Sequence, residues 1–235
     1  CVALRCSTAN AQRTTDYASL VNPLIRTDGK GNVYPGAQAP FGMVQLSPDN
    51  GQPGWDWIAG YFYPDSTIAG FSHTHLSGTG AGDLYDISFL PVTFPLRVAA
   101  KPLGVHSTFN HEREECFAGY YRVHLDSYGI DVELTATERC GVQRYTYPTD
   151  SATVLLNLGK ATNWDATIDT HIAQIDSFTI EGYRYSTGWA RNQQVYFRTR
   201  FSRPISSMKC DSTTIIAGGI IKYAPGKIQF EFKPD

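Results

Sequence analysis

Short runs of β-branched and aromatic residues, each bounded by glycine, proline or other turn residues, recur along most of this chain. Segment 130–136 alternates between apolar and polar residues, which is the pattern of a strand with one buried face. Similar runs predict strands at 87–94, 120–125, 142–147, 153–158, 178–185, 195–201, 213–217 and 227–232. No helical periodicity extends beyond about ten residues. The sequence therefore predicts an all-β fold, an antiparallel sandwich.

The 235 residues suit one sandwich domain, which we expect at 17–235. The tripeptide Ala-Asn-Ala at 9–11 has the form of a signal-peptide cleavage site, so we expect 1–16 to be a leader remnant and linker of an exported protein. Lipid attachment at Cys1 or Cys6 is an alternative. No apolar run approaches the ~20 residues of a membrane-spanning helix, so we expect no transmembrane segment.

Charge and cysteine content exclude several classes of function. The formal net charge is -2 and the basic residues are dispersed, so we expect no nucleic-acid partner. The odd cysteine count without a C-x-x-C pair supports neither a zinc knuckle nor a dense disulfide framework. One disulfide among the last three would suit an oxidising compartment, but we expect isolated buried thiols on strands. The five cysteines are Cys1, Cys6, Cys116, Cys140 and Cys210.

The segment 54–83 combines aromatic, imidazole and carboxylate side chains on a glycine-rich backbone. Such a set suits a sugar, because aromatic rings stack on the apolar face of a pyranose while polar groups bond its hydroxyls. Two histidines spaced two residues apart would share one face of a strand. We therefore predict these substrate-binding residues: Trp55, Asp56, Trp57, His73, His75 and Asp83.

Several motifs occur in a fixed order along the chain. They include Val21-Asn22-Pro23-Leu24-Ile25, Tyr34-Pro35-Gly36-Ala37, Pro40-Phe41-Gly42-Met43, Gly70-Phe71-Ser72-His73-Thr74-His75, Gly119-Tyr120-Tyr121 and Glu133-Leu134-Thr135-Ala136-Thr137. Together they closely resemble the N-terminal part of glycoside hydrolase family 92 α-mannosidases, of the α-1,2-mannosidase type, from about residue 17 to the end. Arg26-Thr27-Asp28 and Ala118 depart locally from the family pattern and barely affect the assignment.

The resemblance implies a galactose-mutarotase-like supersandwich with short helical turns, packed on a C-terminal α/α toroid that this chain lacks. It implies exo-acting, inverting removal of terminal α-mannose from glycans. Inversion requires a general acid and a general base ~6.5–9.5 Å apart. By the resemblance these residues, and most ligands of a calcium cofactor, belong to the toroid. We therefore expect no catalytic or metal-binding residue in this chain and no activity from the chain alone. Its location would be periplasmic, outer-surface or secreted, in a bacterial envelope.

Each candidate has a plainer interpretation. Trp55 and Asp56 would otherwise be a buried ring and a turn cap, the histidines structural, and Asp83 a ligand of loop amides. We interpret Glu112, Glu114 and Glu115 as a solvated edge and not as a glycosidase acid pair. Two further tryptophan segments either extend a carbohydrate-binding face or pack beside turns: Asn163-Trp164-Asp165 and Gly188-Trp189.

Two rival functions remain open at this point. One is a stand-alone carbohydrate-binding β-sandwich in which the tryptophan-rich loop binds mannose unaided. The other is an aldose mutarotase, which has a similar supersandwich fold and requires a histidine and a carboxylate that face an open sheet.

Overall fold

The computed structural model describes residues 16–78, 80–100, 103–159, 163–210, 215–217, 220–223 and 227–232. Cys1, Cys6 and the tripeptide 9–11 lie outside the described residues. The described chain is built from strands and three short 3₁₀ helices, η1 (Tyr17–Leu20), η2 (Trp55–Trp57) and η3 (His111–Arg113). The strands are β1 (Ala37–Gln38), β2 (Gln45–Asp49), β3 (Thr67–Ile68), β4 (Gly70–Ser72), β5 (Ser88–Val92), β6 (Ser107–Thr108), β7 (Glu114–Phe117), β8 (Tyr120–Leu125), β9 (Ile130–Ala136), β10 (Gly141–Thr146), β11 (Ala152–Asn157), β12 (Ala166–Gln174), β13 (Thr179–Thr187), β14 (Gln193–Arg200), β15 (Ile205–Cys210), β16 (Ile215–Ala217), β17 (Ile220–Tyr223) and β18 (Lys227–Phe232).

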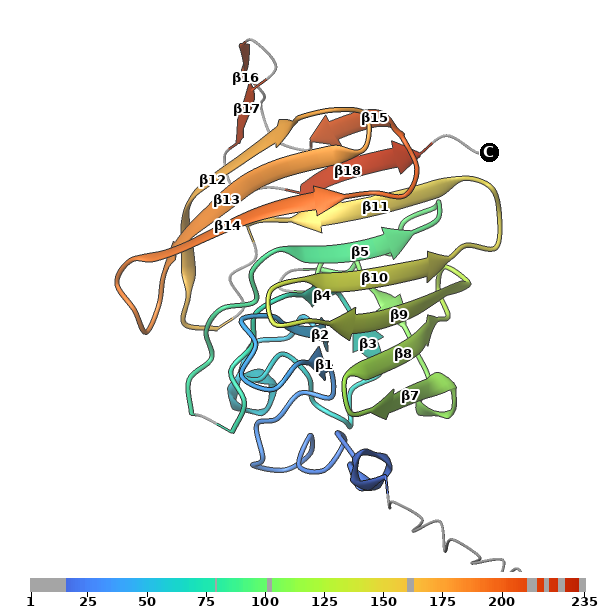
Figure 1. Cartoon of the computed structure of the whole chain (residues 1–235), viewed down its shortest axis with the longest axis vertical. Helices are drawn as coiled ribbons and strands as arrows, with labels where there is room; N and C mark the ends of the chain where they lie inside the picture. Colours follow the sequence, from blue (N-terminus) through green and yellow to red (C-terminus); the bar gives the residue numbers. More distant parts are fainter. Residues whose placement is uncertain are drawn as a thin grey trace, which may run out of the picture.

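The strands form one large sheet and three smaller ones. The large sheet has the order β1-β2-β4-β5-β11-β18-β15. A four-stranded sheet, β10-β9-β8-β7, and a five-stranded sheet, β14-β13-β12-β17-β16, lie in front of it in the view of Figure 1. The short pair β3-β6 completes the set. All pairings between these strands are antiparallel, which confirms the predicted all-β antiparallel fold.

Two hydrophobic clusters hold these layers together. In the first, Leu46 and Phe71 of the large sheet share a core with Val132 and Leu134 of β9. In the second, residues of β5 and β11 pack against the five-stranded sheet, represented by Ile172 and Ile180. Tyr145 and Tyr147 contact both clusters. The two smaller sheets therefore cover adjacent halves of the large one, and the sandwich is closed by apolar burial on both halves.

Two predictions about polar and sulfur-bearing residues are wrong. Glu114 is not part of a solvated edge, because its side chain is 1% exposed and accepts hydrogen bonds from the hydroxyls of Tyr61 and Tyr121. Glu112 and Glu115 are exposed, as expected. Cys140 is an exposed free thiol in the turn before β10, whereas Cys116 is a partly buried free thiol on β7. A turn residue at a sheet edge has no layer to cover it.

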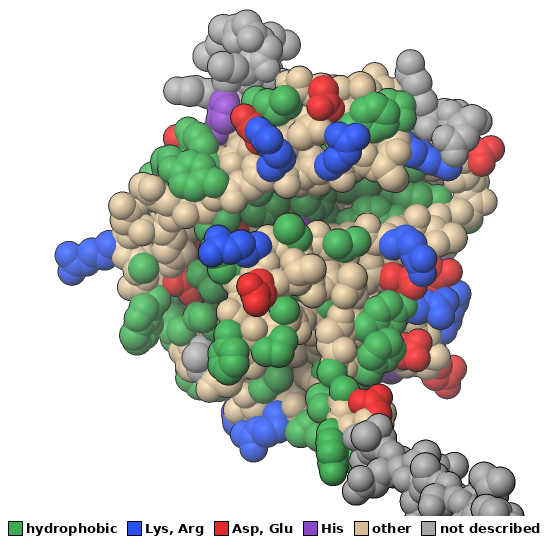
Figure 2. Space-filling model, viewed as in Figure 1, with side chains coloured by type: hydrophobic (Ala, Val, Ile, Leu, Met, Phe, Trp, Pro, Cys, Tyr) green, Lys and Arg blue, Asp and Glu red, His purple; other side chains and the backbone are tan. Residues whose placement is uncertain are grey.

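The surface of the described residues carries mixed charge. On the face shown in Figure 2, basic and acidic side chains are interspersed. No helix among the described residues is long and apolar enough to cross a membrane.

Candidate functional site

Three exposed tryptophans meet one short segment, 80–83, beyond the ends of the strands. Trp55, Trp164 and Trp189 are 49%, 50% and 78% exposed, and together they are called the tryptophan rim. A Cβ added at Gly80 would lie 3.1 Å from Cη2 of Trp55. The backbone N–H of Trp164 donates to the Gly82 carbonyl at 2.9 Å, and that of Trp189 donates to Asp83 Oδ2 at 2.8 Å. Three loops distant in sequence thus gather around one segment.

A hollow of about 520 Å³ opens at this segment. Its lining is mainly apolar, and it consists of Leu76, Gly80, Ala81, Asp83, Leu84, Trp189, Ala190 and Gln193. An open depression with an aromatic wall and few polar groups is a usable surface for the apolar face of a sugar.

Asp83 connects the segment 80–83 to the hairpin between β13 and β14. The residue is 1% exposed, and its carboxylate accepts hydrogen bonds from Leu84 N at 2.8 Å and from Gln193 Nε2 at 2.7 Å, besides the Trp189 bond. A Cβ at Gly188 would lie only 2.5 Å from Asp83 Oδ1, so the hairpin approaches this closely only with glycine there. In the structure Asp83 bonds loop groups, which is the plainer of its two interpretations.

The η2 loop places its three candidates differently. Trp55 contributes its ring to the rim. Asp56 forms an ion pair with Lys30 at 3.3 Å between two side chains that are 36% and 76% exposed, a contact of small energetic value. Trp57 donates its indole N–H to Asp65 Oδ2 at 3.0 Å and packs edge-on against Phe62. Its ring is therefore engaged beside the rim and is not part of it.

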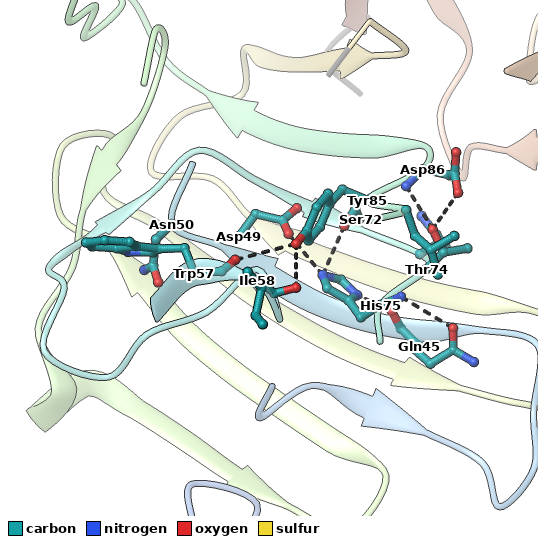
Figure 3. A network of polar contacts seen from close by, with 12 residues as sticks. Gln45, Asp49, Asn50, Trp57, Ile58, Ser72, Thr74, His75, Tyr85 and Asp86 are labelled. Atoms are coloured by element: carbon teal, nitrogen blue, oxygen red, sulfur yellow. Dashed lines mark hydrogen bonds and ion pairs between the residues drawn. The ribbon is translucent and has the colours of Figure 1, made fainter. Parts of the chain in front are cut away.

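His75 lies inside the sandwich, in the polar network of Figure 3. Its Nδ1 donates to the Gln45 carbonyl oxygen at 2.7 Å, while its Nε2 lies 2.9 Å from Asp49 Oδ1 and 3.1 Å from Ser72 Oγ. His75 is 3% exposed, and Asp49 and Ser72 are at most 1% exposed. Serine and aspartate share one ring nitrogen here, so the three residues do not form the relay of a Ser-His-Asp triad.

His73 also packs between layers. β4 ends at Ser72, so the two histidines follow the strand and do not share its face as predicted. The His73 Nδ1 donates to the Ile87 carbonyl oxygen at 2.7 Å, and its ring meets Phe89 edge-to-face. A Cβ at Gly141 of β10 would lie 2.6 Å from His73 Cδ2. Burial lowers the pKa of His73, so its imidazole is neutral at neutral pH.

The structure therefore does not bring the six predicted residues together. Trp55 and Asp83 both lie at the segment 80–83, Asp56 and Trp57 lie in the adjacent η2 loop, His73 is partly buried between the layers, and His75 is buried. Sequence analysis missed Gln193, which lines the hollow, accepts a hydrogen bond from Ser186 Oγ at 3.1 Å and donates to Asp83, 110 positions away. It also missed Tyr85, which donates its hydroxyl hydrogen to the Ile58 carbonyl oxygen at 2.5 Å and whose pKa is raised by burial. Neither residue lies in a local motif that indicates its partner.

Comparisons with known proteins give a consistent result. A family model described as the glycosyl hydrolase family 92 N-terminal domain matches residues 20–233. A family GH92 α-mannosidase from Bacteroides thetaiotaomicron, solved in complex with mannoimidazole, is 33% identical with a TM-score of 0.84, over 92% of this chain and 30% of that chain. The gh92 family glycosyl hydrolase ccman5 is 25% identical with a TM-score of 0.69, over 93% of this chain and 32% of that chain.

A curated relative from Arthroderma benhamiae is described as an uncharacterized secreted glycosidase. It is 27% identical over 155 residues, which cover 60% of this chain and 19% of the relative. The chain thus spans less than a third of the length of each of these proteins.

Proposed function

Because the chain belongs to glycoside hydrolase family 92 as an N-terminal β-sandwich domain, we propose that it forms one wall of the sugar-binding cleft of an exo-acting, inverting α-mannosidase. The tryptophan rim carries this proposal. Trp189 lines the hollow, and Trp55 and Trp164, which are also exposed, contact the segment 80–83 that forms part of its lining; exposed aromatic surface of this kind favours both a sugar ring and a second domain. The substrates would be terminal α-mannosides of glycans, and the partner the C-terminal catalytic domain of the same protein.

The carboxylates near the rim support a division of labour between domains. Asp83 is buried and accepts three hydrogen bonds, and Asp56 is paired with Lys30. Neither is placed as a free general acid or as a base facing a water molecule. An inverting mechanism needs both groups ~6.5–9.5 Å apart across the sugar. We assign them to the C-terminal domain, so this wall would bind and orient the mannoside.

Calcium dependence is part of the same proposal. Among the described residues, no group of three or more His, Cys, Asp or Glu side chains is placed to hold a metal ion. Calcium in proteins takes six to eight oxygen ligands, so the described residues do not fit such a site by themselves. On the family resemblance we propose that most of the calcium ligands belong to the C-terminal domain, and we assign no step in this domain to the ion.

Turnover of an aryl α-mannoside tests this division. The isolated chain should release no product, whereas the two-domain protein should do so with inversion and should lose activity when calcium is chelated. Replacing Trp189 with alanine in the two-domain protein should raise KM without unfolding the domain. Release of mannose by the isolated chain would refute the proposal.

The rival carbohydrate-binding function predicts a different titration. One wall of a two-domain cleft should bind mannose with a dissociation constant of about 1 mM or weaker. Micromolar binding to the isolated chain, abolished by Trp55→Ala, would favour the stand-alone module instead. For a mutarotase, His75 is buried and His73 is partly buried, and both are bonded to backbone carbonyl oxygens, so they do not form an exposed acid–base pair.

We also propose that the protein is exported to the cell envelope or beyond. The support is the tripeptide at 9–11 together with the description of the curated relative as secreted. N-terminal sequencing of the mature protein from culture medium and envelope fractions tests this, and a mature protein retained inside the cell would contradict it.

A further inference from the structure

One buried guanidinium joins segments that are far apart in the sequence. Arg184 lies in the middle of β13, and its side chain is 1% exposed. It pairs with two carboxylates, Asp86 and Asp165, which are both fully buried. Its remaining donors reach three oxygens, namely Leu84 O at 3.4 Å, Leu158 O at 3.2 Å and Thr167 Oγ1 at 3.1 Å.

The segments that Arg184 holds are those that carry the tryptophan rim. Asp86 lies three residues after Asp83, at the hollow, and Asp165 follows Trp164 directly. Asn163 extends the connection, because its Oδ1 accepts from the N–H of Gly54, next to Trp55, at 2.7 Å. β13 itself leads into the hairpin that carries Trp189. Each of the three rim tryptophans is thus within a few residues of a contact of this cluster.

The backbone beside Arg184 would not hold its conformation unaided. Leu84, Tyr85 and Ile87 have φ angles of 81°, 61° and 56°, in the left-handed region that non-glycine residues rarely occupy. Such a run persists only where surrounding bonds over-determine it. Here the Arg184 guanidinium bonds the Leu84 carbonyl and Asp86, and the Thr74 hydroxyl donates to the other oxygen of Asp86 at 2.7 Å.

We propose that Arg184 is a positioning residue that preorganises the tryptophan rim for its ligand, an inference that rests on the proposed function for the identity of that ligand. The planar guanidinium fork bonds two carboxylates, two backbone carbonyls and one hydroxyl at once. A lysine ammonium keeps the charge but has its three donors on one atom, so it cannot reproduce the contacts that Arg184 makes from three separate nitrogens. The geometry of the rim therefore depends on arginine at this position and not on charge alone.

Fluorine NMR of the chain labelled with fluorotryptophan tests the proposal without any ligand. The chain has four tryptophans and gives one resonance for each. In Arg184→Lys we expect the Trp164 and Trp189 resonances to shift or broaden, while that of Trp57, which is bonded to Asp65, stays in place. The matched control is Arg198→Lys on the neighbouring strand, whose arginine pairs with Glu181 at the surface, and it should leave all four unchanged. Four unchanged resonances in a folded Arg184→Lys variant would overturn the proposal.

A second variant covers the case in which Arg184→Lys does not fold. Asp165→Asn keeps the side-chain shape and leaves Arg184 paired with Asp86. It should move the Trp164 resonance most, and an unchanged Trp164 resonance would count against the proposal.

Kinetics of the two-domain enzyme then test whether the contacts of Arg184 affect substrate binding. Either variant should raise KM for an α-mannoside about tenfold, with kcat changed less than about twofold, because the rim binds and does not react. Equal losses in kcat and in folded fraction would indicate a purely structural role and reject the proposal. If the resonances move but the wild-type two-domain protein lacks mannosidase activity, the positioning role of Arg184 is supported and the proposed function is refuted.

Discussion

The histidine network and the tryptophan rim each take a residue from the same stretch of sequence, 54–83, namely His75 and Trp55, yet these two residues have opposite environments. His75 is 3% exposed and bonded on both ring nitrogens, whereas Trp55 is 49% exposed. The usual preference of polar side chains for water and of large aromatic side chains for the core is inverted in both places. The comparison separates buried polar residues, which we expect to stabilise the fold, from the exposed tryptophans that we propose contact a ligand or partner.

The difference has a simple physical origin. A buried polar group is tolerated when it has hydrogen-bond partners, and both ring nitrogens of His75 are already bonded to groups inside the sandwich. An exposed indole is tolerated when it has a function outside the domain. Substitutions in the network should therefore change stability, and substitutions in the rim should change binding.

The largest expected effect is that of His75→Leu. The substitution leaves the buried Asp49 carboxylate without its hydrogen bond to the imidazole, and losing a hydrogen bond to a buried charged group costs about 3 kcal/mol or more in the free energy of unfolding. Urea unfolding followed by far-UV circular dichroism measures this. The control is Trp189→Ala, which should change the free energy by less than about 0.5 kcal/mol because the ring is 78% exposed. Similar losses in the two variants would break the comparison.

Glu114→Gln tests whether a second buried polar cluster contributes to the free energy of unfolding as the His75 network does. The Glu114 carboxylate accepts from Tyr61 at 2.9 Å, from Tyr121 at 2.6 Å and, on its other side, pairs with His111 at 2.6 Å. The amide is isosteric but turns one acceptor into a donor, so we expect a loss of about 1.5–3 kcal/mol. The exposed neighbour supplies the matched control, because Glu115→Gln should be nearly neutral. An equal effect of both substitutions would show that burial does not decide the outcome.

The sequence predicted most of the fold because alternation and turn residues are local signals. The structure places β8, β9 and β18 at the predicted bounds. β12 was missed, because a bulge between Thr167 and Asp169 interrupts the alternation that identifies a strand. β1 and β3 have two residues each, too few for any periodic pattern.

The candidate site was only partly predictable. Trp55 was predicted from composition, whereas Trp164 and Trp189 were left between a carbohydrate-binding face and packing beside turns. The separation of Trp55 from the histidines depends on contacts between remote positions. Arg184 and Asp86 are 98 residues apart, and Asp83 and Gln193 are 110 apart. No local pattern records such a pairing. Resemblance to a family located the segment, and three-dimensional packing decided which of its side chains are accessible.

A pH titration sharpens the comparison through His73. Burial lowers the pKa of His73 in the folded state. As the pH falls below about 6.5, the ordinary pKa of histidine, this residue is therefore protonated in the unfolded chain before it is protonated in the folded chain. Its contribution to stability is thus complete above that pH and is lost on acidification, at most about 1.4 kcal/mol per pH unit.

His73→Asn should flatten the wild-type slope between pH 7.5 and 5.5 while keeping a donor for the Ile87 carbonyl oxygen. Urea midpoints at several pH values provide the measurement. The rim variant Trp189→Ala should retain the wild-type slope. A slope unchanged by His73→Asn would show that this histidine is protonated equally in both states.

The smallest expected effect is that of Gly80→Ala. The new Cβ would lie 3.1 Å from Cη2 of Trp55, so the indole must move by a few tenths of an ångström, and the far end of a half-exposed side chain yields easily. We expect a change in the free energy of unfolding below about 0.5 kcal/mol, together with altered Trp55 fluorescence and weaker mannoside binding in the two-domain protein. The same substitution in a Trp55→Phe background should leave the fluorescence of the other three tryptophans unchanged. If it alters them as strongly as before, the methyl group disturbs the whole rim, and the contact between Gly80 and Trp55 is not what sets the position of that ring.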